Sequence, residues 1–212
     1  MTDNSFAAFS VLQAKMDCLP SLRLQSIPAA DTLAISVDLN NGFAKHGALY
    51  SERVAALIPG TVRFAQQCKS LAIRLIAVSD HHSPDSPEFS GFPPHCLQGT
   101  DEPLIVEELR GFIDQTIAKS STNGFYRLME HGLIEPFHNF IITGCCTDIC
   151  VFTLATAIKT WFNEQNRNCR VIVPVSLVDT YDAPAHSASL LNPVFFGSML
   201  DGGIEVVADI LF

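Results

Sequence analysis

Reactive side chains follow four short apolar runs of the sequence. They are Asp38 after residues 32–37, Asp80 after 72–79, Lys119 after 112–118, and the Gly144-Cys145-Cys146-Thr147 turn that ends the run 140–144. Apolar runs rich in β-branched residues are typical of parallel strands that are covered on both faces. Ligands of such sheets bind at the carboxyl ends of the strands. We therefore expect two carboxylates, an ammonium group and a cysteine-bearing turn to share one edge of a sheet.

Cys150 is the candidate nucleophile. Thr147 is a residue type that caps helices and Asp148 suits a first helical turn, so we expect Cys150 in the first turn of a helix. The helix dipole and the free amides of that turn favour an anion, which predicts a lowered pKa for the Cys150 thiol. The alternative is that Cys150 is a small buried apolar residue, as we expect for Cys18 and Cys68.

The neighbouring candidates qualify this assignment. Cys145 and Cys146 are expected to be structural, although their backbone amides could matter more than their sulfurs. Lys119 is expected at a buried strand end, which is costly unless the ammonium group is paired. Asp38 ends an otherwise apolar strand, and beside a thiol the two residues would supply a proton acceptor and a charge that stabilises a thiolate. The alternative is a structural ion pair near a loop.

A possible metal site begins at the second predicted strand end. Asp80 and His82 are two residues apart, so in an extended strand end their side chains point the same way. The following Pro-rich segment adds Glu88 and His95. Two imidazoles and two carboxylates suit Zn²⁺, Fe²⁺ or Mn²⁺. The alternative is that these histidines are solvated; His81, which should face the other way, is not expected to be a ligand.

The pattern of apolar runs and helical spacing predicts the elements that position these residues. Strands are expected at 32–37, 72–79, 112–118, 140–144, 170–175 and 204–207, and helices at 5–15, 51–70 (broken at Pro59-Gly60), 124–132, 147–163 and 183–200. Alternation of strand and helix predicts an α/β fold, with three layers around a mostly parallel six-stranded sheet. The irregular segment 80–103 is longer than an ordinary loop and is expected to be functional or mobile.

Composition and charge exclude several classes of protein. The 212 residues include 13 Lys and Arg against 22 Asp and Glu, a net charge of −9, and 48% of residues are hydrophobic. With a mean hydropathy of +0.25 the chain is not of the disordered class. An acidic chain argues against a nucleic-acid partner. The uncharged apolar stretch at 149–158 is far short of the ~20 residues of a membrane span, so no membrane partner is expected.

The seven cysteines and the apolar excess set further expectations. Their odd number, their irregular spacing and the non-basic start of the chain argue against a secreted disulfide framework, which predicts a reducing, cytoplasmic setting. One domain is the default at this length. The apolar excess is expected to lie in the core or in an oligomer interface.

Five segments resemble the isochorismatase-like cysteine hydrolases, and within them the nicotinamidase (pyrazinamidase) branch. They are Asp38-Leu39-Asn40-Asn41-Gly42-Phe43, Asp80-His81-His82, Phe92-Pro93-Pro94-His95-Cys96-Leu97-Gln98-Gly99-Thr100, Lys119, and Gly144-Cys145-Cys146-Thr147-Asp148-Ile149-Cys150-Val151. The resemblance covers about residues 31–208, which implies a Rossmann-like hydrolase domain at 31–212 after an N-terminal extension at 1–30.

The resemblance also implies roles for individual residues. Asp38, Lys119 and Cys150 would be the catalytic triad, and the metal ligands would fall on Asp80, His82 and His95, with the fourth on Glu88. A cis peptide bond would join Cys145 to Cys146, and the amides of Cys146 and Cys150 would form the oxyanion hole. Phe43 and Phe92 would sandwich the substrate. The implied cofactor is a divalent metal, Zn²⁺ ahead of Fe²⁺ or Mn²⁺, and the implied assembly is a homo-oligomer, a dimer or a tetramer.

The implied activity is hydrolysis of nicotinamide to nicotinate and ammonia through a Cys150 thioester, with the metal orienting the pyridine ring. Asn40, Gly42 and Phe92 depart from the residues usual in nicotinamidases, Gln, Asp and Trp, which leaves the substrate open. One alternative is another small-amide amidase, or an isochorismatase, of the same superfamily. A second is a non-catalytic metal-binding or redox protein, although the cysteines lack the Cys-x-x-Cys spacing of structural zinc sites.

Overall fold

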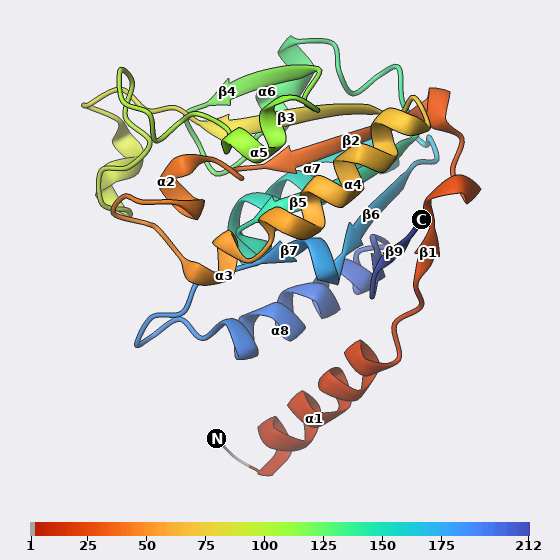
Figure 1. The fold of residues 1–212 in the computed structure, drawn as a ribbon. Helices are drawn as coiled ribbons and strands as arrows, with labels where there is room; N and C mark the ends of the chain where they lie inside the picture. Colours follow the sequence, from red (N-terminus) through yellow and green to blue (C-terminus); the bar gives the residue numbers. More distant parts are fainter. Residues whose placement is uncertain (1–2) are drawn as a thin grey trace.

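A sheet of seven parallel strands runs through the part of the chain that the computed structural model describes, residues 3–212. The strand order is β4-β3-β2-β5-β6-β8, with β7 paired to β5. The strands are β2 (Thr32–Val37), β3 (Arg74–Asp80), β4 (Gln115–Lys119), β5 (Asn139–Cys145), β6 (Arg170–Pro174), β7 (Val178–Asp179) and β8 (Glu205–Val207). All six predicted strands are present (Figure 1), which confirms the predicted α/β class. The additional strand, β7, is two residues long and too short for a periodic signal.

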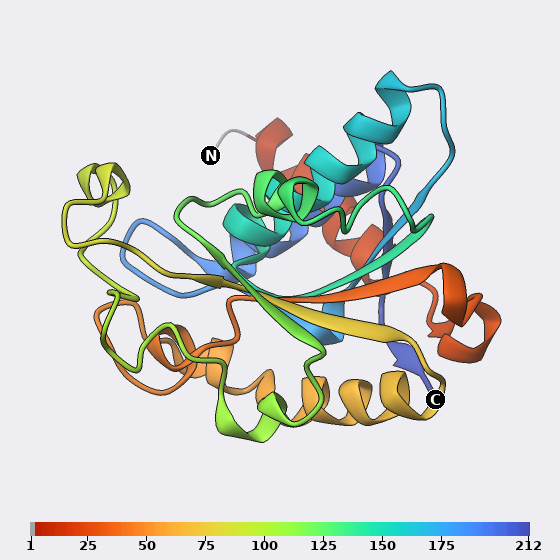
Figure 2. The same cartoon turned by 90° about the horizontal axis from the view of Figure 1, so that it is seen from above.

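Helices cover both faces of the sheet. The helices of the described residues, of which α1 lies outside these layers, are α1 (Asp3–Asp17), α2 (Asn41–Ala44), α3 (Glu52–Ala55), α4 (Ile58–Ser70), α5 (Glu107–Arg110), α6 (Phe125–Glu130), α7 (Phe152–Glu164) and α8 (Ala188–Asp201). Successive residues of a strand point to opposite faces, so Ala34 of β2 packs in one apolar cluster with Phe64 of α4, whereas Leu33 packs in another with Phe162 of α7. Figure 2 shows α4 and α5 on one side of the sheet and α6 and α7 on the other, the predicted three layers.

Two predicted helix boundaries are wrong. Residues 51–70 form two helices, but the break falls at residues 56–57, and Pro59 lies in the first turn of α4, where its missing N–H is not needed. The helix predicted over 183–200 begins only at Ala188. Residues 183–186 instead form a turn, closed by backbone hydrogen bonds in both directions between Ala183 and His186.

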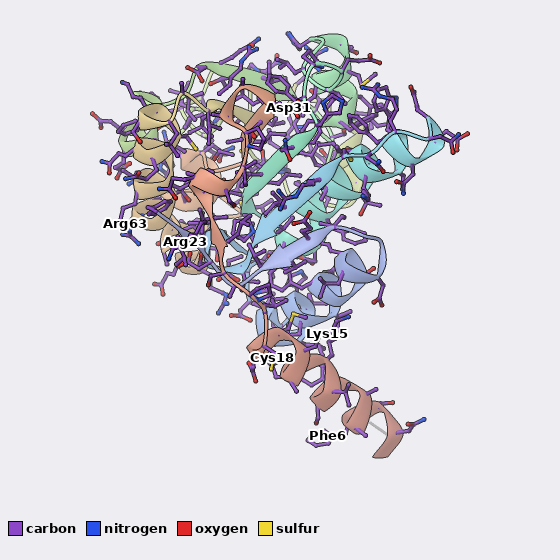
Figure 3. The ribbon with its side chains drawn as sticks, turned by 90° about the vertical axis from the view of Figure 1, so that its right-hand side faces the viewer. Phe6, Lys15, Cys18, Arg23, Asp31 and Arg63 are labelled. Carbon is purple, nitrogen blue, oxygen red and sulfur yellow. The ribbon has the colours of Figure 1, made fainter. Side chains whose placement is uncertain are left out.

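The N-terminal segment lies outside the three layers. The helix predicted over 5–15 is α1, which lies beside α8, with Lys15 Nζ 3.5 Å from Asp201 Oδ1. Figure 3 shows α1 extending away from the sheet, with Phe6 and Cys18 near its opposite ends. After α1 the chain forms β1 (Leu22–Arg23), which pairs in parallel with β9 (Ile210–Leu211) as a separate small sheet. Among the described residues, no helix has both the length and the apolar character to cross a membrane.

Gly144, near the end of β5, makes a close approach that only glycine permits. Its φ is +106°, and a Cβ at this position would lie 1.9 Å from the carbonyl oxygen of Val37 in β2. We expect Gly144→Ala to lower the free energy of unfolding by roughly 3 kcal/mol or more, because the cost of a positive φ for alanine and the cost of the clash with the backbone add together. Urea denaturation measures this loss. Gly111→Ala is the matched control, since nothing lies within 4 Å of its added Cβ; equal stability of the two variants would contradict the prediction.

Candidate active site

One pocket lies at the carboxyl ends of the central strands. The chain passes from β2 to β3 on one side and later to β5 on the other, so the switch point of the sheet lies between β2 and β5, where parallel sheets bind ligands. Eight residues singled out from the sequence line this pocket: Asp38, Phe43, Asp80, Glu88, Phe92, His95, Cys146 and Cys150. Lys119 and His82 are buried directly behind this lining.

Asp38, Lys119 and Cys150 come together as expected, although they lie on three different strand ends. Lys119 Nζ lies 2.9 Å from Asp38 Oδ2 and 3.6 Å from Cys150 Sγ. A carboxylate oxygen of Asp38 and Cys150 Sγ are within 4.8 Å of each other. Asp38 has φ +53°, and its Oδ1 accepts the N–H of Asp80 at 2.8 Å, which fixes the carboxylate. The arrangement can hold a proton acceptor and a cation beside one thiol.

Burial dominates the proton affinities of this group. Burial and the charge of Asp80 raise the pKa of Asp38 to about 6, against the opposing charge of Lys119. Burial acts to lower the pKa of Lys119, but the charges of Asp38 and Asp80 outweigh it and hold that pKa well above its ordinary value. Lys119 therefore stays an ammonium, while Asp38 is more basic than an exposed aspartate.

The predicted lowering of the Cys150 pKa is wrong. Burial raises the pKa of the Cys150 thiol well above its ordinary value, and the charges of Asp38 and Asp80 raise it further against the attraction of Lys119. Helix position alone predicts a thiolate because it ignores this desolvation. The resting group is a thiol, so a base must remove its proton before it can act as a nucleophile.

Cys150 lies in a π-helical turn, Thr147–Val151, which leads into α7. It is within the first turn, as predicted, but Cys146 rather than Thr147 is the N-cap residue, and no side-chain hydrogen bond caps this end. The Cys145–Cys146 peptide bond is cis, as the resemblance implied. Cys145 is wholly buried, with Sγ 3.4 Å from the carbonyl oxygen of Asp38.

Asp80, His82 and His95 form a cluster of possible metal ligands, with one donor atom of each within 4.8 Å of the others. Asp80 Oδ1 lies 3.5 Å from His82 Nε2, and Asp80 Oδ2 lies 3.5 Å from His95 Nε2. Glu88 joins them, with Oε2 3.4 Å from His82 Nε2. His81, as expected, is not in the cluster and lines a different hollow on the surface.

The donor atoms of this cluster fit a divalent cation. His95 Nδ1 lies 2.8 Å from the carbonyl oxygen of Pro93, which can only accept, so in the neutral ring Nδ1 is the donor and Nε2 carries the lone pair that a metal would take. His82 Nδ1 contacts the hydroxyl of Ser86 at 3.3 Å. His82 Nε2 and Glu88 Oε2 are buried and have no hydrogen-bond partner among the described residues. Unpartnered nitrogen and oxygen donors that converge in this way suit Zn²⁺ and similar ions.

Aromatic rings surround the cluster. The rings of Phe43 and Phe92 lie 5.6 Å and 6.1 Å from the His95 ring, each edge to face. Asn40 positions Phe43, because its side-chain oxygen accepts the N–H of Phe43 at the start of α2. Phe89, which sequence reasoning missed, lies 5.4 Å from the His82 ring. The sequence indicated this residue only through its place in the irregular segment 80–103, which we expected to be functional or mobile.

Two further residues of the pocket, Thr122 and Tyr181, had no signal in the sequence. The N–H of Thr122 donates to Glu88 Oε1 at 2.9 Å, and its carbonyl accepts from Thr153 Oγ1 at 2.7 Å. Thr153 Oγ1 also lies 3.2 Å from the carbonyl oxygen of Cys150. Thr122 thereby links Glu88 to the helix that carries Cys150.

Comparisons with known proteins agree with this geometry. Nicotinamidase 1 of Arabidopsis thaliana is 30% identical over 181 residues, which cover 73% of this chain and 71% of the relative. The solved structure of a Bacillus subtilis nicotinamidase is similar with a TM-score of 0.70 and 20% identity, over 84% of this chain and 99% of that one. The N-carbamoylsarcosine amidase of Thermoplasma acidophilum has a TM-score of 0.69 and 22% identity, over 84% and 95%.

The parallel sheet with this pocket at its switch point defines an α/β protein with a ligand site at the carboxyl ends of its strands. The family model of the Isochorismatase domain matches residues 32–201. The chain therefore belongs to the isochorismatase family.

Proposed function

We propose that this protein is a nicotinamidase-type amidohydrolase, which converts nicotinamide to nicotinate and ammonia. The observation that carries the proposal is a metal-type donor set, the cluster of Asp80, His82 and His95 with Glu88 in contact with His82, beside a buried thiol with its own carboxylate and ammonium group. A thiol site alone suits any amide. The added donor set suits a small amide whose ring carries a lone pair, as a pyridine does, and the likeness to the Arabidopsis nicotinamidase supports this substrate.

In the proposed mechanism Asp38 removes the proton from Cys150 Sγ, and the thiolate attacks the amide carbon. Lys119 stabilises the thiolate by its charge and holds Asp38 in place. The backbone N–H groups of Cys146 and Cys150 hold the oxyanion, an interaction worth roughly 2.7–4 kcal/mol of barrier per donor. Asp38 then protonates the departing ammonia. Water hydrolyses the thioester, which releases nicotinate and restores the thiol.

Phe43 and Phe92 are proposed to hold the ring of the substrate between them. Asp80, His82, Glu88 and His95 would hold the divalent metal, with Zn²⁺ proposed before Fe²⁺ or Mn²⁺. When bound, that ion would supply a Lewis acid for the ring nitrogen and so orient the carboxamide towards Cys150.

Metal content tests the donor set. Protein purified without chelators is expected to contain a stoichiometric divalent metal, and His95→Ala is expected to weaken metal binding at least about 100-fold and to raise KM more than it lowers kcat. Inductively coupled plasma analysis and ammonia release measure the two effects.

His81→Ala is the matched control, because His81 is the neighbouring histidine outside the donor set. It should keep its metal. If His95→Ala retains the wild-type metal content, His95 is not a ligand. If the wild-type protein binds no metal and releases no ammonia from nicotinamide, the substrate is another small amide.

A further inference from the structure

Tyr181 stands between the pocket and a second hollow on its outer side. Tyr181, Leu49 and Ser51 line both, and the outer hollow also includes Arg53 and Asp182. Tyr181 packs against the apolar cluster that contains both Cys146 and Phe43, and its ring stacks on His186, whose Nε2 lies 2.8 Å from Asp148 Oδ2. Through that contact Tyr181 is tied to the turn that carries Cys150, Thr147–Val151, at this side of the pocket.

The ring of Tyr181 is held by His186. The two rings are stacked, 3.7 Å apart and 8° from parallel. His186 Nδ1 lies 3.0 Å from the carbonyl oxygen of Tyr181, and its Nε2 lies 2.8 Å from Asp148 Oδ2. Both ring nitrogens of His186 thus face oxygens that accept hydrogen bonds. His186 thereby joins the ring of Tyr181 to Asp148.

Asp148 connects this stack to the turn that carries Cys150. It lies two residues before Cys150, and its side chain is only 7% exposed. Its second oxygen, Oδ1, is buried without a hydrogen-bond partner among the described residues, so His186 is the contact that satisfies this carboxylate. Loss of His186 would release Tyr181 and leave Asp148 unpaired.

The rest of the loop is fastened independently of His186. Arg53 of α3 donates to Asp179 Oδ1 and to the carbonyl of Thr180, and Asp182 accepts the N–H of Ala188 at the start of α8. Figure 1 shows the β7–α8 loop passing beside α3 at this end of the molecule. These anchors fix the backbone on either side of Tyr181, so its ring has a defined place.

We propose that Tyr181 is a specificity-determining residue that restricts this enzyme to primary amides, by filling the space that a substituent on the amide nitrogen would need. His186 and Asp148 are positioning residues that hold it there. This inference rests on the proposed function. Because Tyr181 lies beside the nucleophile turn, its ring confines the leaving group to ammonia, and its removal would connect the pocket to the outer hollow.

The first test compares nicotinamide with N-benzylnicotinamide, measured as nicotinate released. Tyr181→Ala is expected to raise the ratio of kcat/KM for N-benzylnicotinamide over nicotinamide by about ten-fold or more. Tyr181→Phe should keep the wild-type ratio, because the stack uses the ring and not the hydroxyl. An unchanged ratio in Tyr181→Ala would overturn the inference.

Three histidine variants test the positioning role. His186→Ala should raise the same ratio, and His186→Gln should do so too, because Gln can donate to Asp148 but cannot stack on Tyr181. His138→Ala is the control, since His138 makes a similar pair with Asp31, 2.8 Å apart, at the opposite end of the sheet, and it should match the wild type. A wild-type ratio in both His186 variants would overturn the role of His186.

A second measurement does not depend on amide hydrolysis. The rates at which iodoacetamide and the bulkier N-phenylmaleimide modify Cys150 can be followed by peptide mass spectrometry, and Tyr181→Ala should raise the maleimide rate relative to the iodoacetamide rate. If wild-type protein yields no nicotinate but this rise is observed, the proposed function fails while the role of Tyr181 as a barrier is supported. The absence of a rise in either measurement, the ratio of kcat/KM values or the relative maleimide rate, would overturn the inference.

Discussion

Cys150→Ala is expected to lower kcat for nicotinamide by roughly 10⁴- to 10⁶-fold, because alanine cannot form the thioester and Cys150 is the thiol that lies beside both Lys119 and Asp38. Lys119 and Asp38 remain in the variant, but neither is expected to attack the amide carbon in place of the thiolate. Ammonia release with a coupled assay measures the loss. The fold should survive, since Cys150 is a small side chain and alanine leaves only a small cavity.

The control is Cys18→Ala, which should leave turnover unchanged: Cys18 is exposed, so the expectation that it is buried was wrong, and it is not among the residues that line the pocket. Thermal denaturation shows whether each variant is folded. The sharper measurement is trapping: wild-type protein quenched during turnover should carry a nicotinoyl group on Cys150. Turnover by folded Cys150→Ala within ten-fold of the wild type would remove the nucleophile assignment.

Asp38→Asn is expected to lower kcat by roughly 10³- to 10⁴-fold, because the amide of Asn cannot take the proton that the buried thiol must lose. The raised pKa of Cys150 makes this base necessary: a site with a resting thiolate would not need one. Since base and nucleophile act as a unit, the double variant with Cys150→Ala should be little worse than Cys150→Ala alone.

Alkylation of Cys150 distinguishes a base from a structural role. The negative charge of Asp38 raises the pKa of the thiol, so Asp38→Asn should leave iodoacetamide labelling of Cys150 equal to or faster than in the wild type, while turnover collapses. Slower labelling together with lost turnover would indicate a disturbed site instead. Asp31→Asn, which changes an aspartate at the opposite end of the sheet, is the control for a general effect of lost charge.

Much of the fold could be predicted because its signals are local. The residues of β2 form an uncharged run in which Leu33, Ala34, Ile35 and Val37 are apolar, and both faces of that run are buried. Asp38, Asp80 and Lys119 were predicted to meet because each ends such a run, and in parallel strands those ends share one edge. The predicted homo-oligomer, the domain boundary near residue 31, the cytoplasmic setting and the choice of Zn²⁺ stay predictions.

What could not be predicted depends on contacts between distant segments. The pKa of Cys150 is set by desolvation among carboxylates from other strands, not by its place on a helix. The turn at residues 183–186 is apolar and resembles the start of α8, but pairing of His186 with Asp148, 38 residues away, favours a loop. No sequence motif marks Tyr181, because its place in the pocket is set by the fold of that loop.

The backbone contacts of Thr122 bear on which substitutions the whole site can tolerate. Its N–H donates a hydrogen bond to Glu88, and its carbonyl accepts one from the hydroxyl of Thr153, one helical turn after Cys150. Thr122 is therefore one link between the metal-type donor set and the turn that carries Cys150, beside the hydrogen bond from the N–H of Asp80 to Asp38 and the contacts of Lys119 with both parts. Because Thr122 makes these links with its backbone, substitutions of the side chains around the site leave the links in place.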